Sequence, residues 1–231
     1  YAAAYQAMDW LFPLAARPGT ASFGNIVLPT SQIRTAQAAG ITLLAPGGGV
    51  NAGALASGTV TKKANELGIV SVAGGTIFAA VRDDFEVNQS RVFTLADGDI
   101  LLWSSEGNVD AGRGAKTVSG APAPVLRLDE DGNLLLDTSG SFSGSGIAAL
   151  SASSSVGLFA PRGEVNAGEA GIRSAGNLTV AAAQVRGADN IAVSGQTSGD
   201  TGVAAVGATA SLAGVAQSAG APVSTGATAS E

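Results

Sequence analysis

Short apolar runs divided by glycine and polar residues fill the chain between Gly24 and about Val118. These runs recur roughly every 8 to 15 residues, and runs of this length bounded by turn residues predict β-strands. Residues 147–195 resume the same rhythm, so most of the chain is predicted to be all-β. The runs in the first stretch are Ile26–Leu28, Ile41–Leu44, Ile69–Val72, Thr76–Phe78, Phe85–Val87, Arg91–Leu95 and Ile100–Trp103.

One ten-residue phrase occurs three times, at 44–53, 103–112 and 159–168, with the shared core Gly-x-Val-(Asn/Asp)-Ala-Gly. Internal repetition of this kind indicates stacked units. Glycine permits the positive φ of a sharp corner, and Asn or Asp can hydrogen-bond its own backbone there. The residues predicted to form structural corners are Gly49, Asn51, Gly53, Gly107, Asp110, Gly112, Gly163, Asn166 and Gly168. A ligand site built on the polar members is the alternative.

Residues 1–14 form the best helix candidate. Tyr1, Tyr5, Met8 and Phe12 recur at helical spacing in an alanine-rich segment, and Pro13 disfavours helix before it. This helix is predicted to cap or link the β-structure, with partner binding as the alternative.

Residues 116–146 interrupt the strand rhythm. Leu126–Leu128 and Leu134–Leu136 flank a polar stretch and predict a protruding hairpin. Its tip is the candidate recognition surface and contains Asp129, Glu130, Asp131 and Asn133. The tip resembles the start of a calcium loop. Counted from Asp129, such a loop requires glycine at the sixth position and glutamate at the twelfth, where this chain has Leu134 and Gly140. The match to a calcium loop therefore fails.

Three regions follow: a helix and linker at 1–20, a β-helix domain at 21–195 with the insertion at about 116–146, and a small-residue tail at 196–231. The tail is predicted to be partly ordered or a linker.

The composition favours a thin core. The chain has 33 glycines and only 13% charged residues, roughly twice and half of the usual shares. Small side chains fill little volume, so two backbone layers must lie close together, as they do in a β-solenoid. Stacked coils of about 20 residues, about 4.8 Å apart, would make about nine coils.

Several classes of chemistry are excluded by composition. The chain has no cysteine and no histidine, which removes disulfides, Cys/His zinc sites and His-dependent nucleophiles. The net charge is -6, and the three lysines and nine arginines form no basic stripe for nucleic acid. No apolar run reaches the length of about 18 residues that a membrane helix needs. We predict no catalytic residue, metal or cofactor.

Two further groups could carry chemistry. Asp83, Asp84 and Glu86 form the densest acidic patch, and paired carboxylates cleave glycans in some β-helix enzymes. A solvated turn is favoured, because adjacent residues of a strand point to opposite faces. Trp10 and Trp103 could stack on sugars, although Trp103 is expected in the core or at a coil end.

Six segments resemble the C-terminal region of filamentous haemagglutinin-type exoproteins: Pro13–Gly19, Ser31–Thr35, Leu44–Gly53, Val87–Leu95, Gly98–Ser105 and Asp110–Thr117. The resemblance implies a secreted or cell-surface bacterial protein that is exported by two-partner secretion. It also implies a long right-handed parallel β-helix that acts in adhesion, aggregation or biofilm matrix. No catalytic motif is carried over.

The expected function is therefore that of a non-catalytic structural and adhesive module, with a surface glycan or protein as receptor. One alternative is a self-assembling filament subunit that associates through its coil ends, which the N-terminal helix and the tail could otherwise cover. The other alternative is a carbohydrate-active β-helix enzyme, a polysaccharide lyase or a glycosidase.

Overall fold

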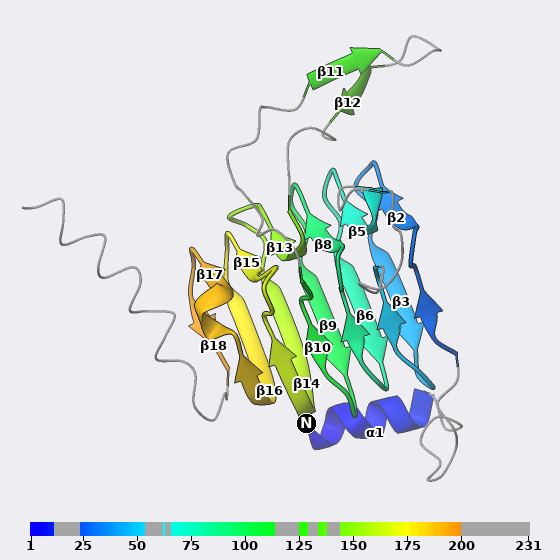
Figure 1. Ribbon diagram of the computed structural model, residues 1–231, viewed down its shortest axis with the longest axis vertical. Coiled ribbons are helices and arrows are strands. Elements are labelled where there is room, and N and C mark those ends of the chain that lie inside the picture. Colours follow the sequence, from blue (N-terminus) through cyan, green and yellow to red (C-terminus); the bar gives the residue numbers. More distant parts are fainter. Residues whose placement is uncertain are drawn as a thin grey trace, which may run out of the picture.

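A computed structural model describes residues 1–11, 24–53, 62, 66–113, 125–128, 134–137 and 144–199. An α-helix, α1 (Ala2–Leu11), precedes a stack of short strands (Figure 1). The strands form three parallel rows, and each turn of the chain adds one strand to each row. The arrangement confirms the prediction of an all-β fold built from stacked parallel strands.

The first row lines one wall of the stack, and every neighbouring pair in it is parallel. Its strands are β3 (Ile41–Ala45), β6 (Ile77–Val81), β9 (Ile100–Ser104), the first half of β14 (Val156–Asn166), the first half of β16 (Leu178–Arg186) and β18 (Thr197–Ser198).

The strands of the second row are shorter. Those that come before β14 have two residues each, whereas β14 and β16 continue from the first row around the corner into the second. It contains β1 (Ile26–Val27), β4 (Val50–Asn51), β7 (Phe85–Glu86), β10 (Val109–Asp110) and the second halves of β14 and β16.

The third row closes each coil and is also parallel throughout. It contains β2 (Gln32–Thr35), β5 (Gly68–Ser71), β8 (Arg91–Thr94), β13 (Gly146–Ala149), β15 (Ile172–Ser174) and β17 (Ile191–Val193), and a short 3₁₀ turn, η2 (Ala188–Asn190), lies before β17.

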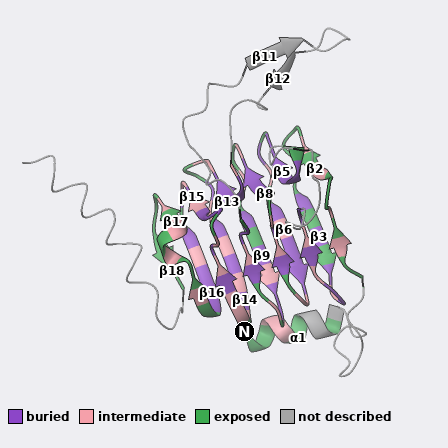
Figure 2. Cartoon of the chain, in the orientation of Figure 1, coloured by how far each residue is buried: buried purple, intermediate pink, exposed green. Residues whose placement is uncertain are grey.

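The core runs as columns of equivalent side chains through the stack (Figure 2). In the first row Ile41, Ile77 and Ile100 lie in register and point inward. Residues of β3 alternate between buried and exposed, as a strand with one face in a core requires. Small residues such as Ala45 and Ala111 are fully buried, which agrees with the thin core expected from the composition.

The sequence repeat is not the coil repeat. The strand β7 lies between β4 and β10, so a whole coil separates the first two copies of the phrase. That coil carries a diverged copy, Phe85–Asn88, in which Asn88 takes the place of the final glycine. Among the described residues Asn88 is the only non-glycine with positive φ, at 54°.

The expected number of about nine coils is too high. The third row has six strands, because the insertion between β10 and β13 and the residues after 199 add no described strand to the stack. Six strands spaced by about 4.8 Å span roughly 24 Å.

The predicted hairpin is present. The strands β11 (Val125–Leu128) and β12 (Leu134–Asp137) pair antiparallel and lie apart from the three rows (Figure 1). Its tip, with the candidate residues Asp129, Glu130, Asp131 and Asn133, lies outside the described residues, and so does the tail from residue 200. The proposed domain boundaries therefore stay predictions.

The helix α1 does not cover an end of the stack, which corrects the expected capping role. It lies along the flank, across the lower ends of several strands (Figure 1). Its Tyr5 hydroxyl donates a hydrogen bond of 2.7 Å to the carbonyl oxygen of Ser105, in a middle coil. On this flank the Tyr5 ring also packs against the half-buried ring of Trp103, 5.7 Å away.

Two glycines in successive coils allow the cost of backbone strain to be distinguished from the cost of a steric clash. Gly168 and Gly187 have similar φ values, 56° and 66°. A Cβ on Gly187 would have its nearest neighbour at 3.4 Å, whereas one on Gly168 would overlap the Gly112 carbonyl oxygen.

We expect Gly187→Ala to lower the free energy of unfolding by about 1 kcal/mol. Gly168→Ala should cost roughly 1–3 kcal/mol more, because the neighbouring coil must move. Urea denaturation measures both, and equal costs would contradict coil-to-coil contact at Gly168.

Candidate functional site

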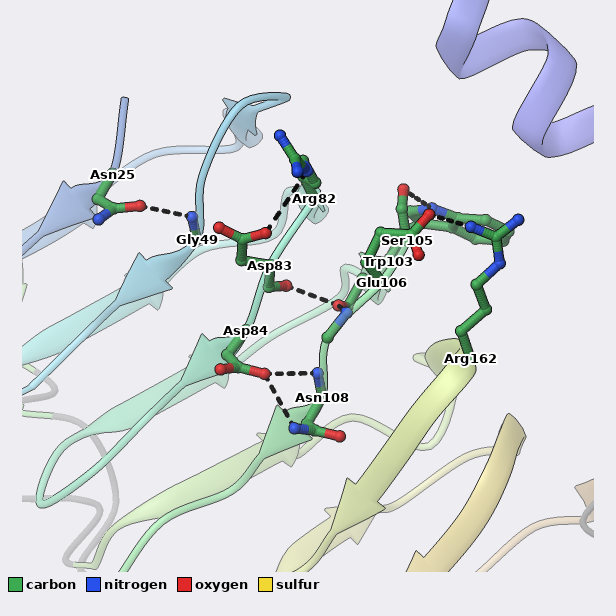
Figure 3. Close-up of polar contacts among 12 residues, drawn as sticks. Asn25, Gly49, Arg82, Asp83, Asp84, Trp103, Ser105, Glu106, Asn108 and Arg162 are labelled. Carbon is green, nitrogen blue, oxygen red and sulfur yellow. Dashed lines mark hydrogen bonds and ion pairs between the residues drawn. The ribbon is translucent and has the colours of Figure 1, made fainter. Parts of the chain in front are cut away.

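A strip of polar side chains lies on the surface where the first row turns into the second, and it includes Asp83 and Asp84 of the acidic patch. We call this strip the polar corner and define it by Asn25, Arg82, Asp83, Asp84, Glu106, Asn108, Arg162 and Glu164 (Figure 3). It follows the stack from coil to coil and faces α1 at one side.

The three Asn or Asp residues of the repeated phrase each accept a hydrogen bond from the backbone two residues ahead. Asn51 Oδ1 accepts from Gly53 N at 3.1 Å, Asp110 Oδ1 from Gly112 N at 2.6 Å, and Asn166 Oδ1 from Gly168 N at 2.9 Å. These are Asx-turns, which stabilise tight corners. Asn166 Nδ2 also donates to Asp110 Oδ2 at 3.1 Å, so the caps are linked between coils.

A second column of side chains joins the backbones of adjacent coils. Asn25 Oδ1 accepts from Gly49 N, and Asp84 Oδ1 accepts from Asn108 N, each at 2.8 Å (Figure 3). Asn108 Oδ1 accepts from Glu164 N, also at 2.8 Å. Each bond satisfies an amide that the short second-row strands leave unpaired. The column therefore has a structural role at these three steps.

The predicted corner glycines allow backbones to touch. A Cβ on Gly49 would overlap the Asp84 carbonyl oxygen, and one on Gly163 would overlap that of Gly107. A Cβ on Gly107 would come within 2.5 Å of the Asp83 carbonyl carbon. Aligned by the phrase, Gly48 is the equivalent of Gly107 and Gly163, whereas Gly49 is the equivalent of Asn108.

The acidic patch forms part of one shallow depression. Asp83, Asp84 and Glu86 line it together with Asn25 and Asn51, and its volume is about 290 Å³. Residues 82–84 form a turn, as expected, but the turn places both aspartates beside the same depression. In a strand, the two side chains would have pointed to opposite faces.

The carboxylates of this depression differ in their surroundings. Asp84 accepts two hydrogen bonds from Asn108, and Asp83 lies 3.7 Å from the Arg82 guanidinium. Burial raises the pKa of Glu86, and the nearby charges of Asp84 and Asp110 raise it further. A carboxyl with a raised pKa suits a general acid, but stacked acids in a structural column produce the same shift.

An aromatic cluster lies beside the polar corner. The Trp103 ring stands 5.7 Å from Tyr5 of α1 and 6.0 Å from Phe159 of the next coil. Both neighbours of Trp103 along β9 are buried inward, so Trp103 faces outward, neither in the core nor at a coil end as expected. Trp10, the other candidate, is 81% exposed.

Arg162 joins the cluster to the polar corner. Its guanidinium lies 4.4 Å from the centre of the Tyr5 ring and pairs with Glu106 (Figure 3). Burial is the main cause that raises the pKa of Tyr5. Sequence reasoning missed Arg162 and Phe159. Aligning the second and third copies of the phrase would have paired Trp103 with Phe159 and Glu106 with Arg162.

Within the described part of the chain, no group of three or more acidic, cysteine or histidine side chains is arranged to hold a metal ion. Over the same residues, no helix has the length and apolar character needed to cross a membrane.

Comparison with known proteins bears on the family. Residues 97–203 match a family model described as filamentous haemagglutinin family outer membrane protein, which confirms the resemblance stated above. No curated protein and no solved structure gives a significant match to the chain.

The Asx-turns can be tested at Asn166. Asn166→Ala removes the cap on the Gly168 amide and the bond to Asp110, so we expect the free energy of unfolding to fall by about 1–2 kcal/mol. Gln89→Ala is the control, since Gln89 is exposed beside the equivalent corner of another coil. Chemical denaturation of both variants measures the difference, and an equal small effect would contradict the structural role.

The raised pKa of Glu86 predicts a pH-dependent stability. The folded protein holds the Glu86 proton more tightly than the unfolded chain does. In the unfolded chain the pKa of this carboxyl is near 4.5. This carboxyl therefore adds stability at low pH that is lost as the pH rises through the folded value.

We expect Glu86→Gln to raise the midpoint of urea unfolding at pH 7. The variant should also show a smaller increase in stability than the unmodified protein when the pH is lowered from 7 to 4.5. Glu169→Gln, an exposed carboxylate in another coil, is the control. A lower midpoint for Glu86→Gln at pH 7 would show that its charge is stabilised by the fold.

Proposed function

We propose that this chain, whose residues 97–203 match the filamentous haemagglutinin family outer membrane proteins, is a non-catalytic structural and adhesive module of a large bacterial surface protein. The observation that carries the proposal is the use of the polar corner. Its side chains join the backbones of successive coils, and the Asx-turns at the end of the second row cap the backbone of their own coils, so both groups serve to build the stack.

A stack of parallel coils suits reach and display. Each coil is held by hydrogen bonds to both neighbours, so length grows with coil number without a larger core. The proposal includes a right-handed stack, since crossover connections between parallel strands favour that hand strongly. It also includes a place at the cell surface, which the family description supports. Export by two-partner secretion is part of the proposal because the resemblance to filamentous haemagglutinin-type exoproteins implies it.

Recognition falls to the surfaces that the stack leaves exposed. The flank bearing α1 presents exposed aromatic and charged side chains, including Trp10 and Arg162. The hairpin of β11 and β12 lies away from the rows (Figure 1), and its acidic tip is the second candidate. We propose that a surface glycan or a protein receptor binds there and contributes to aggregation or biofilm matrix.

A carbohydrate-active enzyme is the second candidate, because one depression gathers three carboxylates and one of them has a raised pKa. Glycosidases require one protonated and one free carboxylate on either side of the scissile bond. Here Asp84 accepts hydrogen bonds from Asn108, and Asp83 forms an ion pair with Arg82. These contacts support a structural use of the acids.

The two candidates make opposite predictions for turnover. We expect the purified chain to release no reducing ends and no unsaturated products from acidic polysaccharides, while binding to bacterial or host-cell surfaces stays measurable. Cleavage that disappears in Asp83→Asn, Asp84→Asn or Glu86→Gln would overturn the non-catalytic proposal. Glu169→Gln controls for a general effect of losing one negative charge.

A further inference from the structure

One interface in the stack is joined by the longest connection between consecutive strands of the three rows, from β10 to β13. The segment 24–113 ends just after β10, and the segment 144–199 begins just before β13. These two segments meet where β14 pairs with β9 and β10, and where β13 pairs with β8. We call this interface the seam.

The chain that joins the two segments is residues 114–143. Closing a long connection costs more conformational entropy than closing a tight turn, and it imposes no register on the strands it joins. The other connections between the rows are shorter, and most are tight corners such as the one between β6 and β7. At the seam, side-chain contacts must set the register.

Side chains cross the seam along its whole width. At one corner Asp97 accepts hydrogen bonds from Ser151 and Ser153, which lower the pKa of Asp97. Beside it, Asp99 Oδ1 accepts from the Ser155 amide at 2.7 Å. The contacts at the opposite corner are Trp103 with Phe159, Glu106 with Arg162, Asn108 with Glu164 and Asp110 with Asn166.

The helix α1 contacts both sides of this interface. The Tyr5 hydroxyl bonds to the Ser105 carbonyl oxygen of the first segment, at 2.7 Å. The ring of the same tyrosine lies under Arg162 of the second segment, 4.4 Å from the guanidinium. Tyr1 adds a ring contact to Trp103 at 6.4 Å.

We propose that α1 is a strap across the seam, and that release of α1 lets the two segments separate there before the rest of the stack unfolds. The strap gives an adhesive rod a defined weak joint, which opens at one interface while the other coils stay paired. The inference concerns the opening of the fold and stands whether or not the module is adhesive.

Hydrogen exchange of the full-length chain tests the strap, because backbone amides on each interface report its opening separately. The seam is reported by Ile100 N, Ala111 N and Gly146 N, which donate to Ser155 O, Asn166 O and Ser90 O. The neighbouring interface is reported by Ile77 N and Phe85 N, which donate to Asp99 O and Asn108 O.

Tyr5→Ala should speed exchange of the seam amides roughly ten-fold, since one hydrogen bond and one aromatic pair are lost. The reference amides should keep their rates. Tyr5→Phe, which loses the hydroxyl alone, should give a smaller change at the same amides. Gln6→Ala on the exposed side of α1 is the matched control and should change nothing.

Arg162→Gln removes the contact from the other side and should speed the same seam amides. Equal acceleration at both interfaces in these variants would show that the stack opens as one unit, and would overturn the strap. Unchanged rates in Tyr5→Ala would also overturn it, because α1 would then add nothing to the seam.

Discussion

Backbone hydrogen bonding between parallel strands of successive coils is the constraint on which the rest of the structure depends. It places each coil about 4.8 Å from the next, so equivalent residues form columns and every column must tolerate its own repetition. Inward columns are apolar. At the corners a single Cβ on Gly163 or Gly168 would overlap the carbonyl oxygen of the coil beside it.

The same spacing decides what the polar residues can do. Stacked Asn and Asp side chains lie within hydrogen-bond reach of the next coil, and they satisfy amides that the two-residue strands leave open. Stacked acids repel one another, which is one reason for the raised pKa of Glu86 beside Asp84 and Asp110. Opposite charges attract across the same distance, as Glu106 and Arg162 do. A corner that is committed to holding coils together has few free groups for catalysis.

Local patterns in the sequence predicted the strands and the hairpin, because each of these depends on neighbours along the chain. The corner prediction relied on positive φ, which among its glycines only Gly112 and Gly168 adopt. The coil repeat was harder to predict, since Phe85–Asn88 lacks the glycine that marks the other copies and Asn88 adopts positive φ in its place. The position of α1 could not be derived from its own residues. It depends on Trp103, Phe159 and Arg162, which only the stacked arrangement brings together. The direction of Trp103 was missed because its run is apolar throughout, and alternation along β9 is visible only once the strand is known to have an outer face.

Pulsed electron paramagnetic resonance distances between spin labels test the in-register stack most directly. The absence of native cysteine permits paired labelling at Thr42, Thr179 and Ser198, which lie on one outward column through the pairing of their strands. Thr179 and Ser198 lie four and five coil steps from Thr42, so their backbone positions should be about 19 Å and about 24 Å away. Label distances that differ by about one coil step would support the stack. Distances that increase in proportion to separation in sequence would contradict the stacked arrangement. A Thr42–Ser198 distance shorter than the Thr42–Thr179 distance would also contradict it.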